Sequence, residues 1–341
     1  MPVFPKPGFS FDYNLATERR AFDEFFAGRG IPAKRGSELD LATWNIANLG
    51  AQKRRPKDLA LIAHILARFD VIAVQEVRAQ LAHFREVMRR LGNRFRCVFT
   101  DVAGNEERLA VVYRPARVRP GPLVAELDYN PNGVVRNGTY IIEPKKQRLR
   151  LGGRSIETFF ENFNRNPMLT TWEVVGSQRR FLIANVHIYY GSSNSAKFNN
   201  RIAEVYFLAD WAKACQRRSN AAKVYEPNVV LIGDMNVPTM ASDDRVYRAL
   251  TRRGFVRTRY SSEAGTTIQE FTSYDQIVFA NENLPLTPIN GQSAVVVDFD
   301  NFVFRRLWQQ VEAGERTLSQ FKAWTKFAIS DHRPVFVRMR V

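Results

Sequence analysis

The sequence predicts an α/β protein in which short apolar strands alternate with amphipathic helices. Apolar runs recur along the chain, and segments with apolar residues at helical spacing separate several of them. Most of the runs end in a residue suited to metal or phosphate chemistry. The runs are Leu41–Asn45, Asp70–Glu76, Leu109–Tyr113, Phe181–His187, Val230–Asn236 and Asp275–Phe279.

The helices are expected between these strands. Residues 1–37 form an N-terminal extension, in which Asn14 to Phe26 has the pattern of an amphipathic helix ended by Gly28 and Gly30. Packing of this helix onto the main domain is favoured over binding of a partner. The remaining chain, residues 38–341, is expected to form one domain. Its predicted helices are Asp58–Phe69, Leu81–Leu91, Asn199–Arg217 and a short one around residues 302–311.

Residues 117–164 are the least regular part of the chain. They are rich in glycine, proline, asparagine and basic residues. Long irregular segments in compact domains are usually functional or mobile. We therefore expect a long basic insertion here, built as a hairpin or a loop excursion.

Composition sets the class of protein. Of 341 residues, 45% are hydrophobic and 12% aromatic, which is typical of a globular chain. No apolar run approaches the roughly 18 residues of a membrane span, so no transmembrane segment is expected. The first residues lack the pattern of a secretory signal. The two cysteines, Cys97 and Cys215, make a disulfide framework improbable, and a cytoplasmic location is expected.

A formal charge of +16 favours a polyanionic partner such as nucleic acid or an acidic membrane. Charge alone is equally compatible with a solvated basic surface. Its placement matters more, because one basic cluster directly follows the Asn45 strand and should lie beside the strand ends. The clusters are Lys53, Arg54, Arg55 and Lys57; Lys145, Lys146, Arg148, Arg150 and Arg154; and Arg252, Arg253, Arg257 and Arg259.

The polar residues at the strand ends each have an ordinary structural explanation. Gly233-Asp234-Met235-Asn236 could be a turn, and His187 could be a satisfied core histidine. Glu76 is harder to explain in this way, because a buried carboxylate is costly without a partner. All these explanations would have to hold together for the chain not to be an enzyme. The set therefore predicts an active site.

Phosphodiester hydrolysis is the chemistry that uses such a set. Mg²⁺ prefers carboxylate and amide oxygens, so Glu76 is the main expected ligand, with Asn45 and Asp331 beside it; Mn²⁺ and Ca²⁺ are alternatives. His187 and His332 would supply an acid and a base. Asp234 and Asn236 would orient the attacking water and hold a phosphate oxygen.

These motifs resemble the endonuclease/exonuclease/phosphatase superfamily, and within it the chain is most similar to the deoxyribonuclease I branch. The resemblance runs from about Leu41 to Met339 in the family's own motif order. The matching segments are Thr43–Ile46, Arg68–Asp70, Gln75–Arg78, Glu107–Leu109, Tyr113–Pro115, Arg165–Pro167, His187, Gly233–Asn236, Tyr274–Ile277 and Ile329–His332.

The resemblance implies a four-layer α/β sandwich of two packed mixed β-sheets flanked by helices, with the site where strand ends of both sheets meet. It implies that Glu76 binds metal near Asn45 and Asp331. Two acid/base pairs are implied, His187 with Glu107 and His332 with Asp275. The implied DNA contacts are Arg165 on a phosphate and Arg78 in the minor groove, and we expect Lys53, Arg54 and Arg55 to bind backbone phosphates.

The chain also departs from the family pattern. Asn105 stands where the secreted nuclease has an aromatic that stacks against DNA, and that family's disulfide cysteines are absent. The leading hypothesis is a metal-dependent endonuclease that cleaves DNA, with double-stranded DNA as the favoured substrate and little sequence specificity, leaving 5′-phosphate and 3′-hydroxyl ends. Two alternatives stay open: a phosphoesterase acting on lipid head groups or inositol phosphates, and an inactive nucleic-acid-binding module. RNA as a substrate is also left open.

Overall fold

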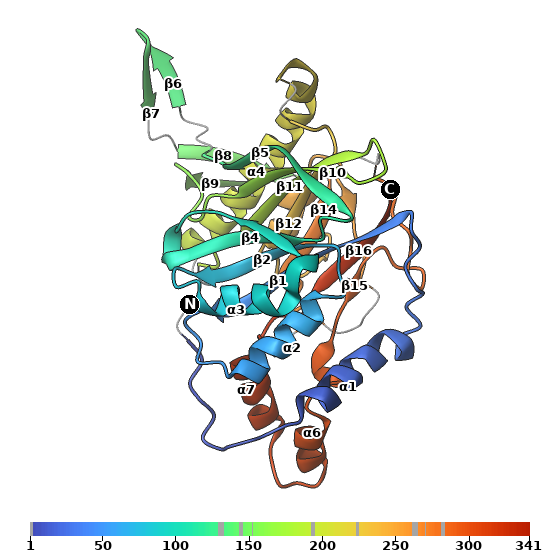
Figure 1. Ribbon diagram of the computed structural model, residues 1–341. Helices are drawn as coiled ribbons and strands as arrows, with labels where there is room; N and C mark the ends of the chain where they lie inside the picture. The colour runs from blue at the N-terminus through green and yellow to red at the C-terminus, as the bar shows by residue number, and fades with distance from the viewer. Residues whose placement is uncertain are drawn as a thin grey trace.

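The computed structural model describes residues 3–128, 133–142, 146–151, 153–191, 195–222, 225–260, 265–269, 271–280 and 284–341. Two mixed β-sheets pack against each other, and helices cover the outer face of each (Figure 1). The predicted four-layer α/β sandwich is confirmed.

The first sheet has six strands among the described residues, in the order β15-β16-β1-β2-β4-β3. Its central strands β1 and β2 are parallel, and the other pairs are antiparallel. The strands are β1 (Glu38–Leu49), β2 (Val71–Arg78), β3 (Arg96–Phe99), β4 (Glu107–Tyr113), β15 (Val295–Val296) and β16 (Val335–Arg340).

The second sheet also has six strands within the described ranges, in the order β13-β14-β12-β11-β10-β5. Here β11 and β12 form the parallel pair. The strands are β5 (Val118–Glu126), β10 (Met168–Val174), β11 (Arg180–His187), β12 (Val229–Asp234), β13 (Val256–Arg257) and β14 (Asp275–Phe279).

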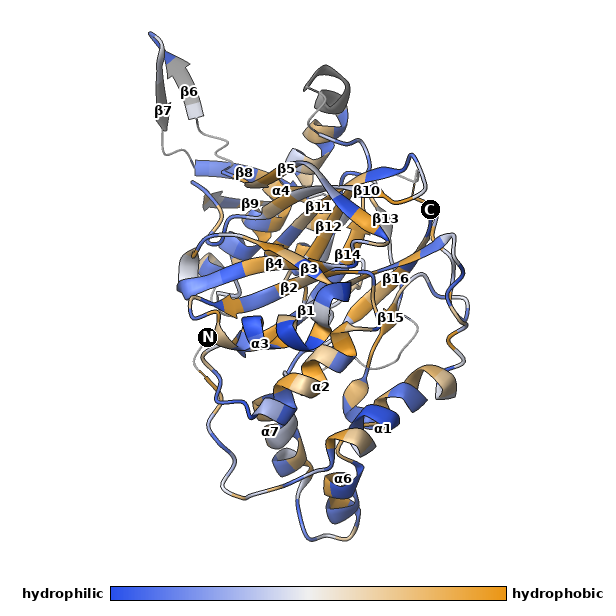
Figure 2. Cartoon of the chain, in the orientation of Figure 1, coloured by the Kyte–Doolittle hydropathy of each residue, from blue (hydrophilic) through white to orange (hydrophobic). Residues whose placement is uncertain are grey.

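Three apolar layers hold the sandwich together. The middle layer joins the inner faces of the two sheets, with Trp172, Phe181 and Val337 fully buried. An outer layer lies between the first sheet and the helices α1 (Leu15–Gly28), α2 (Pro56–Leu66), α3 (Ala82–Leu91), α6 (Arg305–Glu312) and α7 (Leu318–Ala328). The other outer layer lies between the second sheet and α4 (Ser195–Ala222) and α5 (Arg245–Thr251). Figure 2 shows apolar residues concentrated on the central strands.

The N-terminal extension packs onto the first sheet's helices, as favoured from the sequence. Asn14 caps α1 by accepting the backbone N–H of Thr17, and Phe22 and Phe25 are fully buried against the core. The Tyr13 hydroxyl donates to Asp58 on α2 over 2.8 Å. The domain boundary at residue 37 stays a prediction.

The structure corrects only the first part of the expectation for residues 117–164, and the long basic insertion as a whole stays a prediction. The segment begins with β5, which pairs with β10 and so belongs to the second sheet and not to an excursion. Two hairpins follow, β6 (Gly133–Arg136) with β7 (Thr139–Ile142), and β8 (Lys146–Leu151) with β9 (Arg154–Phe159). Helix α7 was not expected either, although Thr317 and Gln320 form a capping box at its start.

No helix in the described part of the chain is both long enough and apolar enough to cross a membrane.

Candidate active site

Three neighbouring strands of the second sheet place their polar residues side by side. His187 on β11 is the register partner of Asp234 on β12, and Asp234 is in turn the partner of Asp275 on β14. All three side chains are buried. Strand pairing alone therefore brings together residues 88 positions apart in the chain.

Gly233 allows this close pairing. Its φ is +139°, and a Cβ atom here would collide with the carbonyl oxygen of Val186 on the adjacent strand. Only glycine fits such an approach. The backbone therefore requires Gly233, and the residue that follows it, Asp234, places its side chain in the site.

The first sheet contributes Asn45 from β1, Glu76 from β2 and Glu107 from the start of β4. Glu76 has φ +59°, in the left-handed region, where the pairing of β2 with β4 shifts register between Val74 and Val77. Such irregularities re-aim side chains and are frequent beside functional sites. Glu76 accepts the backbone N–H of Asn48 over 2.9 Å and the side-chain amide of Asn45 over 3.0 Å.

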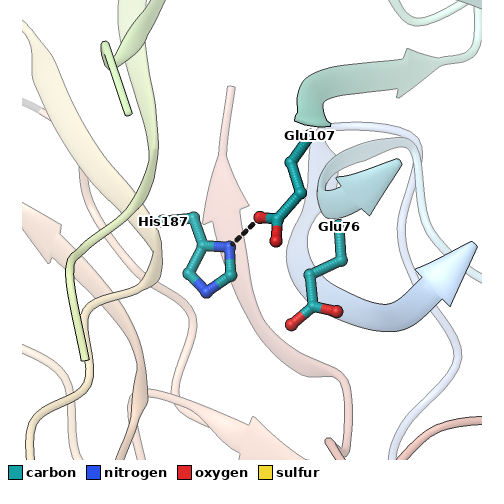
Figure 3. Close-up of side chains that lie close together, drawn as sticks. All are labelled: Glu76, Glu107 and His187. Atoms are coloured by element: carbon teal, nitrogen blue, oxygen red, sulfur yellow. Dashed lines mark ion pairs between the residues drawn. The ribbon is translucent and has the colours of Figure 1, made fainter. Parts of the chain in front are cut away.

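Each of two imidazole–carboxylate pairs joins one sheet to the other. His187 Nδ1 lies 2.9 Å from Glu107 Oε2, with Glu76 beside them (Figure 3). His332, which precedes β16, has its Nδ1 2.8 Å from Asp275 Oδ2. The carbonyl oxygen of His332 accepts the indole N–H of Trp44 over 2.9 Å, which fixes its backbone. The two pairs implied by the resemblance are thus formed in the structure.

Asp234 lies between the two pairs. Its Oδ2 is 3.6 Å from His187 Nε2 and 3.8 Å from His332 Nε2, and it accepts the Asn45 amide over 3.0 Å. Its Oδ1 accepts the backbone N–H of Asn236 over 3.0 Å. One buried carboxylate therefore faces both imidazole rings.

These contacts set the protonation states. Burial opposes ionisation of Asp234 and Glu107, but the imidazoles outweigh it and hold the pKa of each carboxyl below its ordinary value. Burial instead prevails at Asp275, whose pKa rises to about 6. Although burial disfavours a charged imidazole, Asp275 and Asp234 raise the pKa of His332 well above its ordinary value. His332 is thus suited to carry a proton at neutral pH.

The oxygens of the site fit a hard divalent cation. Asn45 Oδ1 and Asp331 Oδ1 are buried and accept no hydrogen bond from any described residue. Burial raises the pKa of the Asp331 carboxyl, and Glu76 reinforces this while His332 opposes it. A bound cation would satisfy both orphaned oxygens and favour the ionised carboxylates. Glu76, Glu107 and His187 also offer ligand atoms within 4.8 Å of one another, as do Asp234, Asp275 and His332.

The two arginines implied to contact DNA are held by the protein itself. Arg165 is buried and donates to the carbonyl oxygens of His187 and Ile188 over 2.7 and 3.0 Å. Arg78 donates to the carbonyl oxygen of Asn105 over 2.7 Å and lies 3.5 Å from Glu107. Arg165 lines the site cavity, so phosphate binding by it stays a prediction. Arg78 is tethered to Asn105 in this structure, and its contact with the minor groove stays a prediction.

The basic cluster after the Asn45 strand differs from expectation. Arg54 is 6% exposed, and its guanidinium donates to the carbonyl oxygens of Ala47 and Ile329, so it cannot reach a substrate. Burial lowers the pKa of Arg54 to about 10, an effect that the nearby carboxylates oppose. Arg55 pairs with Asp58 and faces the N-terminal extension, which also removes it from the site. Lys53 is exposed and stays a prediction.

The second basic cluster is exposed on the β8–β9 hairpin at Lys146, Arg148, Arg150 and Arg154, while Lys145 lies outside the described residues. In the third, Arg252 and Arg253 pair with Asp210.

Two supporting residues were missed from the sequence. Glu204 on α4 is buried and accepts the backbone N–H groups of Asn164 and Tyr189, each over 2.9 Å, so it links the segments that carry Arg165 and His187. Burial raises the pKa of its carboxyl. Ser330 donates to the carbonyl oxygen of Asn45 over 2.7 Å and accepts the N–H of His332. Ser330 lies within the motif segment Ile329–His332, whereas no local sequence pattern indicates a role for Glu204.

The site opens into a cavity of about 520 Å³. Its lining includes the two imidazoles, His187 and His332, together with Asn105, Arg165 and Tyr190, a half-exposed aromatic. Asn236 lines it too, with its side-chain amide donating to the Ile188 carbonyl over 2.7 Å. Thus His187, His332, Asp234, Asn236, Asp331 and Arg165 share one cavity, while Lys53, Arg54, Arg55 and Arg78 do not line it.

Comparison with known proteins gives a consistent result. The sequence profile of the Endonuclease/Exonuclease/phosphatase family matches residues 42–332. A curated protein named deoxyribonuclease, from Thioalkalivibrio sp. (strain K90mix), is 26% identical over 217 residues, which cover 61% of this chain and 49% of that protein. The chain thus spans about half the length of this relative.

Solved structures show the same fold. An endonuclease/exonuclease/phosphatase family protein from Bacteroides thetaiotaomicron superimposes with a TM-score of 0.53 at 14% identity, covering 89% of this chain and 94% of that one. The human Nocturnin catalytic domain gives a TM-score of 0.50 at 16% identity, covering 90% and 96%.

Proposed function

Because the chain belongs to the endonuclease/exonuclease/phosphatase family, we propose that it is a metal-dependent endonuclease that hydrolyses DNA phosphodiester bonds with little sequence specificity. The family match and the buried carboxylate and imidazole clusters identify the chain as a phosphoesterase. Phosphodiester hydrolysis is supported above all by the single carboxylate of Asp234, which faces two imidazoles that are each backed by a second carboxylate.

The arrangement suits attack by water on phosphorus with loss of the 3′-oxygen. Asp234 would orient the water, and His187, backed by Glu107, would take its proton. His332, whose pKa is raised, would give a proton to the departing 3′-oxygen, leaving 5′-phosphate and 3′-hydroxyl ends. A divalent cation held by Glu76, Asn45 and Asp331 would neutralise charge that develops on the phosphate oxygens.

DNA as the substrate is supported by charge and by the relative. The formal charge of +16 favours a polyanion, and one curated relative is named a deoxyribonuclease. Neutralisation of backbone phosphates by basic side chains should make binding fall steeply with salt. The intact pairs argue against an inactive binding module, because both imidazoles keep their carboxylates.

Nicking of supercoiled plasmid in Mg²⁺ tests the proposal. We expect nicks that DNA ligase reseals, because resealing requires 5′-phosphate and 3′-hydroxyl ends, and we expect EDTA to abolish them. Mn²⁺ and Ca²⁺ are compared in parallel. His187→Ala is the negative control, and Cys97→Ser, away from the site, is the matched active control. Equal nicking by His187→Ala, or no nicking by the unaltered protein between pH 6 and 8, would refute the proposal.

A further inference from the structure

A second cavity opens beside the candidate active site, between the loop that carries Thr267 and the helices α6 and α7. Its volume is about 330 Å³. Thr267 and Gln269 line both this cavity and the site cavity, so the two are adjacent. A chain-like substrate bound at the site could therefore extend into this second cavity.

Exposed aromatic side chains line the second cavity. Phe271 is 83% exposed, the highest exposure among the large exposed hydrophobic residues of the described part. Trp308 on α6 is 40% exposed, and its ring is held in place. Its indole N–H donates to Glu312 over 2.9 Å, and the ring packs edge-on against Phe321, with centroids 5.3 Å apart. The Trp308 ring is thus held in one position and is partly exposed to solvent.

Among the described residues that line the second cavity, the basic side chains outnumber the acidic ones. Asp300 lines it, but both carboxylate oxygens accept from Arg333, over 2.7 and 2.6 Å. Lys322 on α7 also lines it, with Nζ 3.5 Å from the carbonyl oxygen of Gln269. Within the described ranges, no carboxylate forms an ion pair with Lys322. The second cavity therefore combines aromatic faces with the ammonium group of Lys322.

We propose that this second cavity binds an unpaired nucleotide of the substrate strand next to the cleaved bond. Its base stacks on Trp308 and Phe271, and its phosphate meets Lys322. Stacking on aromatic side chains beside a cation is how proteins hold single strands without reading sequence. Bases within a duplex have their faces covered by neighbouring bases. The second cavity thus selects single-stranded or locally melted DNA, an inference that rests on the proposed nuclease function.

An anionic lipid surface is the competing occupant of such apolar groups. The second cavity favours a strand because it is concave and adjoins the site cavity, and because aromatic rings and the Lys322 ammonium group line it together, as a base and its phosphate require. A membrane-binding loop would need its apolar groups to project without a facing wall. Vesicles are therefore included as one arm of the test.

The test measures KM and kcat on a dye-labelled single-stranded oligonucleotide, a hairpin duplex of the same composition, and bis(4-nitrophenyl) phosphate. The variants are Phe271→Ala, Trp308→Ala and Lys322→Ala, with Phe271→Tyr as the conservative change. Phe99→Ala, a 41% exposed aromatic on the opposite edge of the first sheet, is the matched control. Circular dichroism melting confirms that each variant is folded.

We expect each aromatic-to-alanine change to raise KM for the single strand by roughly 5- to 160-fold, the range for loss of one stacked base. Hydrolysis of the small diester, which cannot reach the second cavity, should not change, and Phe271→Tyr should retain most of the affinity. Lys322→Ala should lower the slope of log affinity against log salt by about 0.7, the value for one phosphate contact on a single strand.

Three outcomes would overturn the inference. KM for the single strand could be unchanged in both aromatic variants while the unaltered protein cleaves it. The small diester could lose activity to the same extent as the oligonucleotide. The aromatic variants could lose binding to phosphatidylserine vesicles while oligonucleotide cleavage is preserved. By contrast, if the unaltered protein hydrolyses the small diester and no nucleic acid, the proposed function fails first.

Discussion

Replacing Asp234 with asparagine removes one negative charge from between the two imidazoles while keeping the side chain's shape. The Asp234 carboxylate oxygen lies 3.6 Å from His187 Nε2 and 3.8 Å from His332 Nε2. At an effective dielectric of about 20, an ion pair at this distance is worth about 4 to 5 kcal/mol. Removal of one partner from a buried pair typically costs about 3 to 5 kcal/mol, so we expect Asp234→Asn to lower the free energy of unfolding by a similar amount.

The pH dependence of this loss follows from the two pKa shifts. The pKa of Asp234 is lowered, so its contribution is present above the ordinary value of 3.8 and is lost as pH falls. The pKa of His332 is raised, so its contribution is fully present below the ordinary value of 6.5 and is lost as pH rises through the folded-state value. The difference in stability between the two proteins should therefore be greatest from about pH 4 to about pH 6.5.

Urea unfolding of the metal-free protein from pH 4 to pH 10 measures this difference. Asp243→Asn, an exposed aspartate on a nearby loop, is the control and should change stability by less than about 0.5 kcal/mol. Single-turnover plasmid nicking should fall by about two to four orders of magnitude in Asp234→Asn. A stability difference that stays constant across the pH range would refute the charge argument, and near-normal nicking would refute the role of Asp234.

Three further predictions concern residues around the site. Glu204→Gln leaves one backbone N–H without its anionic acceptor, so we expect a loss of about 1 to 3 kcal/mol in thermal melting and slower nicking through a displaced Arg165; unchanged melting and nicking would contradict this. Arg54→Met removes the buried cation near Glu76 and should lower the free energy of unfolding in urea by about 3 to 5 kcal/mol. Lys53→Met should lower it by less than about 0.5 kcal/mol. Similar losses in both variants would show that Arg54 does not stabilise the fold. Asn105→Tyr should raise cleavage of duplex DNA by adding a stacking ring, and Asn105→Gly should not; because φ is +64° here, the tyrosine should cost about 1 to 2 kcal/mol in melting.

The sequence predicted those parts of the site that depend on local patterns. Asn45 and Glu76 follow apolar runs, and strand ends in one sheet meet at one edge, so their proximity could be expected. The partner of His187 could be named only through the resemblance, because Glu107 comes from the other sheet. The burial of Arg54 could not be predicted, because it depends on a hydrogen bond to the carbonyl oxygen of Ile329, 275 positions away in the chain. Local charge patterns do not distinguish a buried arginine from an exposed one.

The misplaced parts of the fold have a similar cause. Residues 118–126 are half exposed and contain two prolines and a glycine, which weaken a strand signal. Such residues are tolerated here because β5 is an edge strand of its sheet. Only the pairing with β10 shows that the segment belongs to the sandwich.

Glu18 on α1 makes the N-terminal segment important for stability, although this segment lies outside the family-matched residues. The carboxylate accepts the backbone N–H of Phe304, which precedes α6 and has φ +58°. A protein shortened to the family-matched residues 42–332 would lose this anchor and bare the apolar surface that Phe22 and Phe25 cover. An exposed apolar surface of this kind promotes aggregation. Expression trials should therefore retain the amino-terminal helix and attach affinity tags ahead of it.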